Sequence, residues 1–154
     1  MSSNSSTDER HRGIFCSEDH KIKALIREQF GAEVELCFYV GGRGKVYAYK
    51  ECEFSIRGKN KGIYFGKIEK DGLRLSIEGS FIVGRFAKKG VLEIHEREAI
   101  DWLNGKDLKS DYKGYCILRW GEYFLGCGKG NGKVIKNYVP KDRRLRASSE
   151  EIGD

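Results

Sequence analysis

"VLEIHEREAIDWLNG", residues 91–105, contains the clearest structural pattern in this chain. "VLEI" is an apolar, β-branched run typical of a strand. In "HEREAIDWLNG" the helical spacing of Ala99, Ile100 and Leu103 places them on one side of a short helix. Gly105 then predicts the end of that helix, because glycine easily adopts the left-handed conformation found there. The stretch therefore predicts a strand and a helix that open a structural unit.

The chain downstream of this helix reads as three further strands. They are "YCILRW" (115–120), "YFLGCG" (123–128) and "KVIKNYV" (133–139). A tight turn at "GE" separates the first two, "KGNG" separates the last two, and Pro140 ends the third. Asn-Gly between two strands is the turn expected of a β-hairpin. The second half of the chain therefore predicts a mostly antiparallel sheet with one helix.

The chain upstream predicts a second unit of similar composition. Residues 17–30 read as an amphipathic helix, with Ser17 as its cap and Gly31 at its end. Short aromatic strands separated by glycine turns follow, at 33–40, 45–50, 52–57, 62–69 and 73–79. Residues 80–90, "SFIVGRFAKKG", fit no single element. We expect an α+β protein with two mostly antiparallel sheets or partial barrels, each carrying a helix.

The size and composition set limits on the class of protein. A chain of 154 residues with 39% hydrophobic residues can form one domain, or two small ones that share a core. No apolar run approaches the roughly 18 residues needed to span a membrane. The polar residues 1–12 and 148–154 are expected to be a flexible leader and a flexible tail. We expect no membrane partner.

The cysteines favour a cytoplasmic protein with free thiols. There are five, and no two of them form C-x-x-C. They are Cys16, Cys37, Cys52, Cys116 and Cys127. An odd number without paired short spacings argues against both a disulfide framework and a zinc site. We therefore expect buried free thiols and no bound metal.

Positive charge is concentrated near the C-terminus. The basic residues between positions 129 and 146 are Lys129, Lys133, Lys136, Lys141, Arg143, Arg144 and Arg146. Asp142 is the only acid among them, so the segment carries +6, which equals the formal net charge of the whole chain. A local excess of this kind favours an anionic polymer or surface. The interleaved Val134 and Ile135 favour a packed strand over a solvated tail.

The glycine-rich run "GKGNGK", residues 128–133, does not fit a nucleotide-binding loop. A P-loop needs glycine five positions before Gly132, where Cys127 stands, and serine or threonine where Val134 stands. No serine lies in a G-x-S-x-G elbow, and the three histidines are scattered. The sequence therefore gives no positive sign of catalysis, and we expect no cofactor.

"GVLEIHEREAIDWLNGKDL" (90–108), followed by "GYCILRWGEYFLGCG" (114–128) and "NYVPKDRRL" (137–145), resembles a PUA domain. This is the RNA-binding module named after pseudouridine synthases and archaeosine transglycosylases. The closing "NYVPKDRRLR" resembles the tails of archaeal RNA cytosine methylases, which also need a large methyl-donor domain for which 154 residues leave no room. Residues 63–90 are similar to the pre-PUA region of a ribosome-biogenesis family, whose C-terminus is less basic.

The resemblance implies an organisation and a site. It implies a pre-PUA-like α/β domain at 13–88 and a PUA pseudo-barrel of mostly antiparallel strands at 89–147. In PUA domains RNA lies against the end of the first helix, the loop after it and the last strand. The RNA-binding residues implied here are Asn104, Gly105, Lys106, Asp107, Leu108, Lys136, Asn137, Tyr138, Lys141, Arg143 and Arg144.

Elementary chemistry agrees with this placement. Arginine offers a planar fork to phosphate, and lysine adds sequence-independent attraction. Tyr138 could stack on an unpaired base, although core packing is the open alternative. Gly105 would allow close approach of RNA to the backbone, or serve only as a helix cap. Arg43 and Lys45 in "GGRGK" either extend the RNA surface or close a hairpin, and the hairpin is favoured.

The leading hypothesis is therefore a non-catalytic RNA-binding protein that acts in rRNA or tRNA maturation, in ribosome biogenesis or RNA modification. A second hypothesis is an RNA-targeting accessory subunit of an RNA-modifying enzyme supplied in trans. A third is an enzyme with a pocket between the two units. The expected partners are RNA and either an RNA-modifying or a ribosome-assembly protein. The sequence names neither the RNA nor the oligomeric state.

Overall fold

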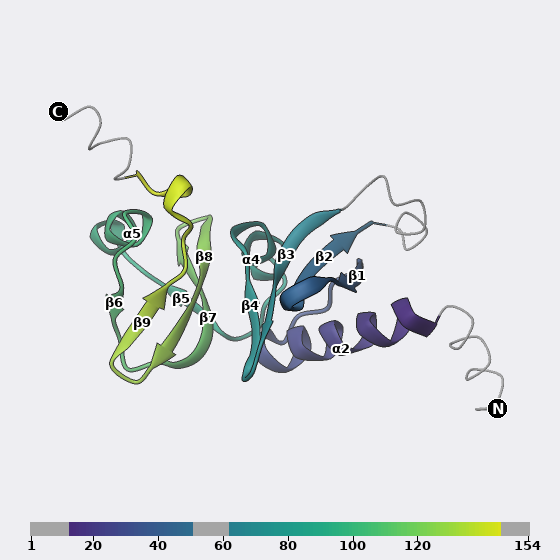
Figure 1. The fold of residues 1–154 in the computed structure, drawn as a ribbon. Coiled ribbons are helices and arrows are strands. Elements are labelled where there is room, and N and C mark those ends of the chain that lie inside the picture. Colours follow the sequence, from purple (N-terminus) through teal and green to yellow (C-terminus); the bar gives the residue numbers. More distant parts are fainter. Residues whose placement is uncertain (1–12, 51–61, 146–154) are drawn as a thin grey trace.

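A computed structural model describes residues 13–50 and 62–145, with side chains from Glu18 onward. The expected leader, the expected tail and the strand expected at 52–57 lie outside these residues. Figure 1 shows two sheets side by side, with helix α4 between them. The described residues form a four-stranded sheet of order β1-β2-β3-β4 and a five-stranded sheet of order β5-β7-β8-β9-β6.

The N-terminal unit packs helix α2 against the four-stranded sheet. Its elements are α2 (Gly13–Phe30), β1 (Cys37–Val40), η1 (Gly42–Gly44), β2 (Lys45–Tyr49), β3 (Ile63–Glu69), β4 (Gly72–Leu75) and α4 (Ile77–Gly84). All strand pairs of this sheet are antiparallel. The amphipathic pattern of residues 17–30 is confirmed, because Ile22, Ile26 and Phe30 are buried against the inner face of the sheet. The helix begins at Gly13, earlier than its predicted cap.

The strand predicted at 73–79 is only half right. The strand ends at Leu75, and α4 follows, so the first part of the segment left unassigned in the sequence, residues 80–84, is helical. Ser76 caps this helix, since its Oγ accepts a hydrogen bond of 2.9 Å from the N–H of Gly79. A Cβ atom on Gly79 would lie 2.1 Å from the carbonyl oxygen of Phe65. Glycine there lets α4 pack directly against β3.

The C-terminal unit opens with the strand, helix and glycine predicted from residues 91–105. Its elements are β5 (Val91–Glu93), α5 (Glu96–Leu103), β6 (Leu108–Lys109), β7 (Lys113–Trp120), β8 (Tyr123–Asn131), β9 (Val134–Asn137) and η2 (Lys141–Arg143). Only β5 and β7 pair in parallel among the described strands. Figure 1 shows the sheet curled into a partial barrel, so the predicted α+β class and PUA-like pseudo-barrel are confirmed.

The glycines near the C-terminus have a different role from the one predicted. Gly128 and Gly130 lie inside β8, paired with β7 and β9, and only Gly132 belongs to the hairpin turn, with φ at +95°. A Cβ atom on Gly128 would lie 2.6 Å from Cη2 of Trp102. These strand glycines therefore make room for close packing across the sheet.

The two units share a hydrophobic core. Ile117 and Cys127 of the second sheet belong to the same buried cluster as the inner face of the first.

Cys116 and Cys127 are free and buried, as predicted, and burial raises the pKa of each thiol to about 12. Cys37 is disulfide-bonded, so the prediction of a free thiol is wrong there. Within the described ranges, no helix is both long and apolar enough to cross a membrane.

Candidate nucleic-acid interface

The three segments singled out in the sequence meet at the C-terminal end of α5. The guanidinium group of Arg144 lies over Gly105, because a Cβ atom on that glycine would be 2.6 Å from Nε of Arg144. The same Nε donates a hydrogen bond of 3.0 Å to the carbonyl oxygen of Val139. Gly105 has φ at +93°, so it is both the helix stop and the space in which the arginine lies. The helix end and the tail therefore form one surface.

Asn137 connects the last strand to the loop after α5. Its Nδ2 donates hydrogen bonds of 2.8 Å to the carbonyl oxygens of Trp102 and Lys106. Its Oδ1 accepts a hydrogen bond of 2.7 Å from the N–H of Val139, and its own N–H donates to Oδ1 of Asp107 at 2.9 Å. Asn137 is only 8% exposed. Its side chain holds the surface together from inside.

Two more of the implied residues also support the loop. The side chain of Leu108 is buried in the cluster around Trp102. Asn104 follows the last residue of α5, and its N–H donates to the carbonyl oxygens of Ile100 and Asp101. These contacts fix the backbone of residues 104–108. Leu108 contributes through burial and does not present its side chain to RNA.

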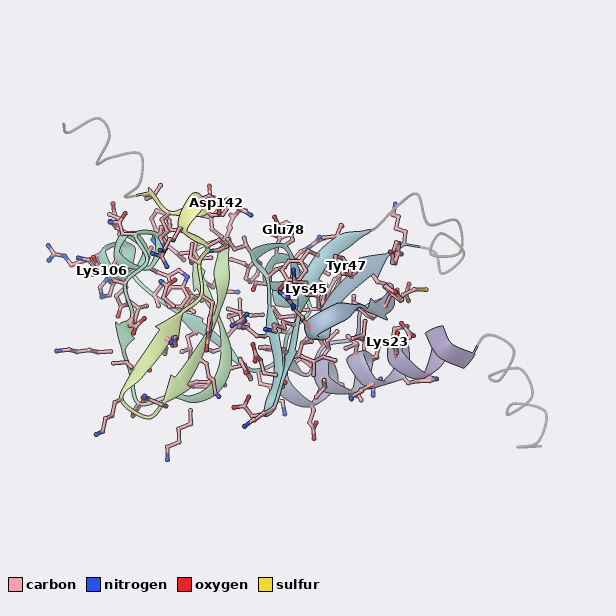
Figure 2. The ribbon with its side chains drawn as sticks, viewed as in Figure 1. Lys23, Lys45, Tyr47, Glu78, Lys106 and Asp142 are labelled. Atoms are coloured by element: carbon pink, nitrogen blue, oxygen red, sulfur yellow. The ribbon has the colours of Figure 1, made fainter. Side chains whose placement is uncertain are left out.

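The exposed cations of this surface come from the loop and the tail. The Lys106 side chain is 58% exposed and lies 3.8 Å from Asp101. Lys141 is exposed and forms no ion pair with any described residue. Arg143 lies beside it in η2 and donates a hydrogen bond of 3.2 Å to Oε2 of Glu78. Figure 2 shows Glu78 near η2, with Lys106 farther away, beside α5.

Lys136 and Tyr138 lie on the other side of β9 from Asn137, since neighbouring side chains of a strand point to opposite faces. The Tyr138 ring faces the N-terminal unit, where Cζ of Arg74 lies 4.3 Å from the ring centroid. The ammonium group of Lys136 lies 5.9 Å from the same centroid. The structure therefore brings most implied residues together at α5 and places these two on a second face.

A cavity of about 200 Å³ lies between the two units. Its lining includes Tyr64 and Arg74 from the first sheet, and Tyr138 and Arg143 from the second unit. Among the described residues, Glu78 is the only carboxylate in this lining, and it is already paired with Arg143. A pocket between the units was one of the open possibilities. Basic and aromatic side chains line this pocket, and the described lining contains no pair of free carboxylates.

Part of the positive charge counted in the sequence is neutralised by the N-terminal unit. Lys129 forms an ion pair with Asp71, which also accepts a hydrogen bond of 2.8 Å from the Tyr115 hydroxyl. These two donors hold the pKa of Asp71 below its usual value. In the described part of the segment, ion pairs are absent from Lys133, Lys136 and Lys141. No three His, Cys, Asp or Glu side chains of the described residues could together hold a metal ion.

Apart from Lys45, which the sequence left open as part of an RNA surface, the sequence reasoning missed a set of aromatic and basic side chains on the first sheet. They share the face opposite α2 and are Tyr39, Tyr47, Tyr64, Lys45, Lys67 and Arg74. The alternation in "KVYAY", residues 45–49, was the available signal, because it puts lysine and tyrosine on one face. The partners on β3 and β4 depend on the register, which the sequence alone does not supply.

The comparisons with known proteins match the C-terminal unit to one family and about two thirds of the chain to curated relatives. Residues 89–145 match a family model described as the methyltransferase RsmF PUA domain. Ribosomal RNA small subunit methyltransferase F from Aeromonas salmonicida is 27% identical over 109 residues, covering 66% of this chain and 23% of that protein. The same enzyme from Aeromonas hydrophila is 25% identical over 124 residues, covering 71% of this chain and 26% of that protein. The chain thus spans about a quarter of the length of these relatives.

Proposed function

Because residues 89–145 form a PUA domain, we propose that this chain binds RNA during ribosomal RNA maturation. The proposed contact surface is the one where the end of α5, strand β9 and η2 meet. Lys106, Lys141, Arg143 and Arg144 would contact phosphates there. We call these four residues the PUA cations.

One observation supports this surface more than any other. Three segments that are far apart in the sequence converge, and Asn137 and Arg144 hold them together through hydrogen bonds. The interior contacts fix the backbone, while Lys106 and Lys141 remain exposed at its rim. A rigid backbone with cations around it suits the shape and phosphate contacts by which structured RNA is recognised.

The finer proposal is that this part of the chain targets RNA and does not itself catalyse a reaction. The two described free cysteines are buried, and their raised pKa keeps them protonated at neutral pH, unlike an activated thiolate nucleophile. The cavity between the units contains one carboxylate, which is already paired. Both features support a binding role.

A second candidate function is suggested by the lengths of the relatives. The aligned region is about a quarter of each rRNA methyltransferase, and residues 89–145 of this chain match the PUA model of that enzyme. We propose that this chain supplies RNA affinity to a methyltransferase whose catalytic part lies outside the described residues, in the same chain or in another. Co-purification of methyltransferase activity that needs the PUA cations would distinguish this function from independent binding.

Charge reversal at two PUA cations tests the proposed surface. We expect Lys106→Glu with Lys141→Glu to weaken binding of a structured rRNA fragment by roughly tenfold or more near 0.1 M salt, because two phosphate contacts are lost. Fluorescence anisotropy across a salt series measures the loss. The matched control is Lys21→Glu with Lys88→Glu, which makes the same charge change away from the surface. Equal losses in the two double variants would argue against this surface.

A further inference from the structure

We propose that the outer face of the β1–β4 sheet is a second RNA-binding surface, which takes single-stranded RNA by stacking its bases on a row of tyrosines. This inference rests on the proposed function, since it takes RNA as the ligand of the chain. It adds a second binding site, whose ligand is single-stranded rather than structured RNA. The site lies in the N-terminal unit, outside the residues that match the PUA model.

The tyrosine row consists of Tyr39, Tyr47 and Tyr64. The strand register pairs Tyr39 with Tyr47, and Tyr47 with Tyr64, so the three rings lie side by side across β1, β2 and β3. The ring centroids of Tyr47 and Tyr64 are 5.8 Å apart with an interplanar angle of 56°. Tyr39 is 37% exposed and Tyr64 is 38% exposed. Aromatic rings presented in this way on a sheet can each stack on a base.

A row of cations runs beside the tyrosines. In the strand register, Lys45 lies opposite Lys67, and Lys67 lies opposite Arg74, across β2, β3 and β4. Lys45 lies two residues from Tyr47, a separation of about 7 Å along the strand and on the same face. Figure 2 shows these two residues together on β2. Phosphates beside the cations and bases on the rings would match the backbone and the bases of one strand.

The two rows lie on the face of the sheet that does not form the shared core. The side chains that alternate with these rows face inward, and Phe38, Val46 and Phe65 are at most 1% exposed in the shared core. Within the described residues, neither Lys45 nor Lys67 forms an ion pair, while Arg74 lies 3.3 Å from Glu69. The charge of the face is therefore positive, which suits a nucleic acid better than an apolar protein partner.

The tyrosine row is continuous with the PUA domain. Arg74 stacks on Tyr138 of the C-terminal unit, with 4.3 Å from Cζ to the ring centroid. Tyr64, Arg74, Tyr138 and Arg143 line the same cavity between the units. A single-stranded segment on the sheet can thus pass directly to the structured RNA held at the PUA cations. The preferred ligand is an RNA helix with an unpaired extension.

Replacing two rings tests the inference. The probes are a fluorescein-labelled oligouridylate of about ten nucleotides and an rRNA stem-loop without an extension. We expect Tyr47→Ile with Tyr64→Ile to weaken oligouridylate binding by about tenfold or more and to leave stem-loop binding nearly unchanged. Isoleucine keeps the strand preference of both positions. The matched control is Tyr123→Ile, at a ring that is 64% exposed at the start of β8.

A crosslinking measurement on the unaltered chain gives an independent answer if the double variant fails to fold. Oligouridylate carrying 4-thiouridine is irradiated with the protein, and the crosslinked peptides are mapped by mass spectrometry. We expect crosslinks at Tyr39, Tyr47 or Tyr64. Crosslinks confined to residues 89–145 would overturn the inference.

The outcomes separate the two proposals. If neither probe binds, the proposed function itself fails. If the stem-loop binds but oligouridylate does not, or if the double variant binds both probes as tightly as the unaltered chain, the second surface alone is wrong. Loss of oligouridylate binding in the control Tyr123→Ile would also count against the row.

Discussion

Trp102→Ala is expected to lower the free energy of unfolding by about 3–5 kcal/mol, because it removes a large side chain from a closed interior. Trp102 has no exposed surface, and Cη2 of its indole packs closely over Gly128. Its Nε1 donates a hydrogen bond of 2.8 Å to the carbonyl oxygen of Leu125. The substitution therefore leaves a cavity and an unpaired acceptor between α5 and β8.

The second tryptophan of the chain is the matched control. Trp120 is 37% exposed near the β7–β8 turn, where it contacts the ring of Tyr123. We expect Trp120→Ala to cost about 1 kcal/mol or less. Urea unfolding followed by circular dichroism compares the two variants. Similar losses at both positions would show that the α5 packing is not as tight as the structure indicates.

Asn137→Ala is expected to lower the free energy of unfolding by about 2–4 kcal/mol, because it leaves buried polar groups without partners. The carbonyl oxygens of Trp102 and Lys106 lose their donor, and the N–H of Val139 loses its acceptor. The same change frees the loop after α5 from β9. We therefore expect weaker binding of structured RNA at a temperature where the variant is still folded.

Asn104→Ala is the control for this substitution. Asn104 lies at the end of α5, and its side chain makes no hydrogen bond with the described residues. Its expected cost is within about 0.5 kcal/mol. Thermal unfolding compares the stability of the two variants, and the RNA affinity of Asn137→Ala is compared with that of the unaltered chain by anisotropy at a temperature where the variant is folded. An Asn137→Ala variant as stable as the control would show that Asn137 does not hold the three segments together.

The sequence predicted the elements whose signals are local. In α5 the apolar spacing and Gly105 lie within eleven residues of each other, so the helix and its end could be read directly. In α4 the run "IEGSFIVG" is mostly apolar, with Glu78 and Ser80 as its polar residues, and lacks the period of an exposed helix. Its helical state depends on burial between two sheets. The two-residue strand β6 depends on pairing with β9.

The candidate site could be predicted only in outline. The segments around Gly105 and Arg144 were found from the resemblance, and the structure brings them together. The acidic partners of Lys129 and Arg143 could not be predicted. These partners, Asp71 and Glu78, belong to the other unit and are far away in the sequence. The tyrosine row was missed for the same reason, since it requires the register of three strands.

The most direct test of the central claim is the salt dependence of RNA binding by the unaltered chain. The measurement is fluorescence anisotropy of a structured rRNA fragment at a series of salt concentrations. If four to six cations contact phosphates, the logarithm of affinity should fall against the logarithm of salt with a slope of about −3 to −4. No binding at low salt, or binding that does not change with salt, would contradict the account of a basic RNA-binding surface.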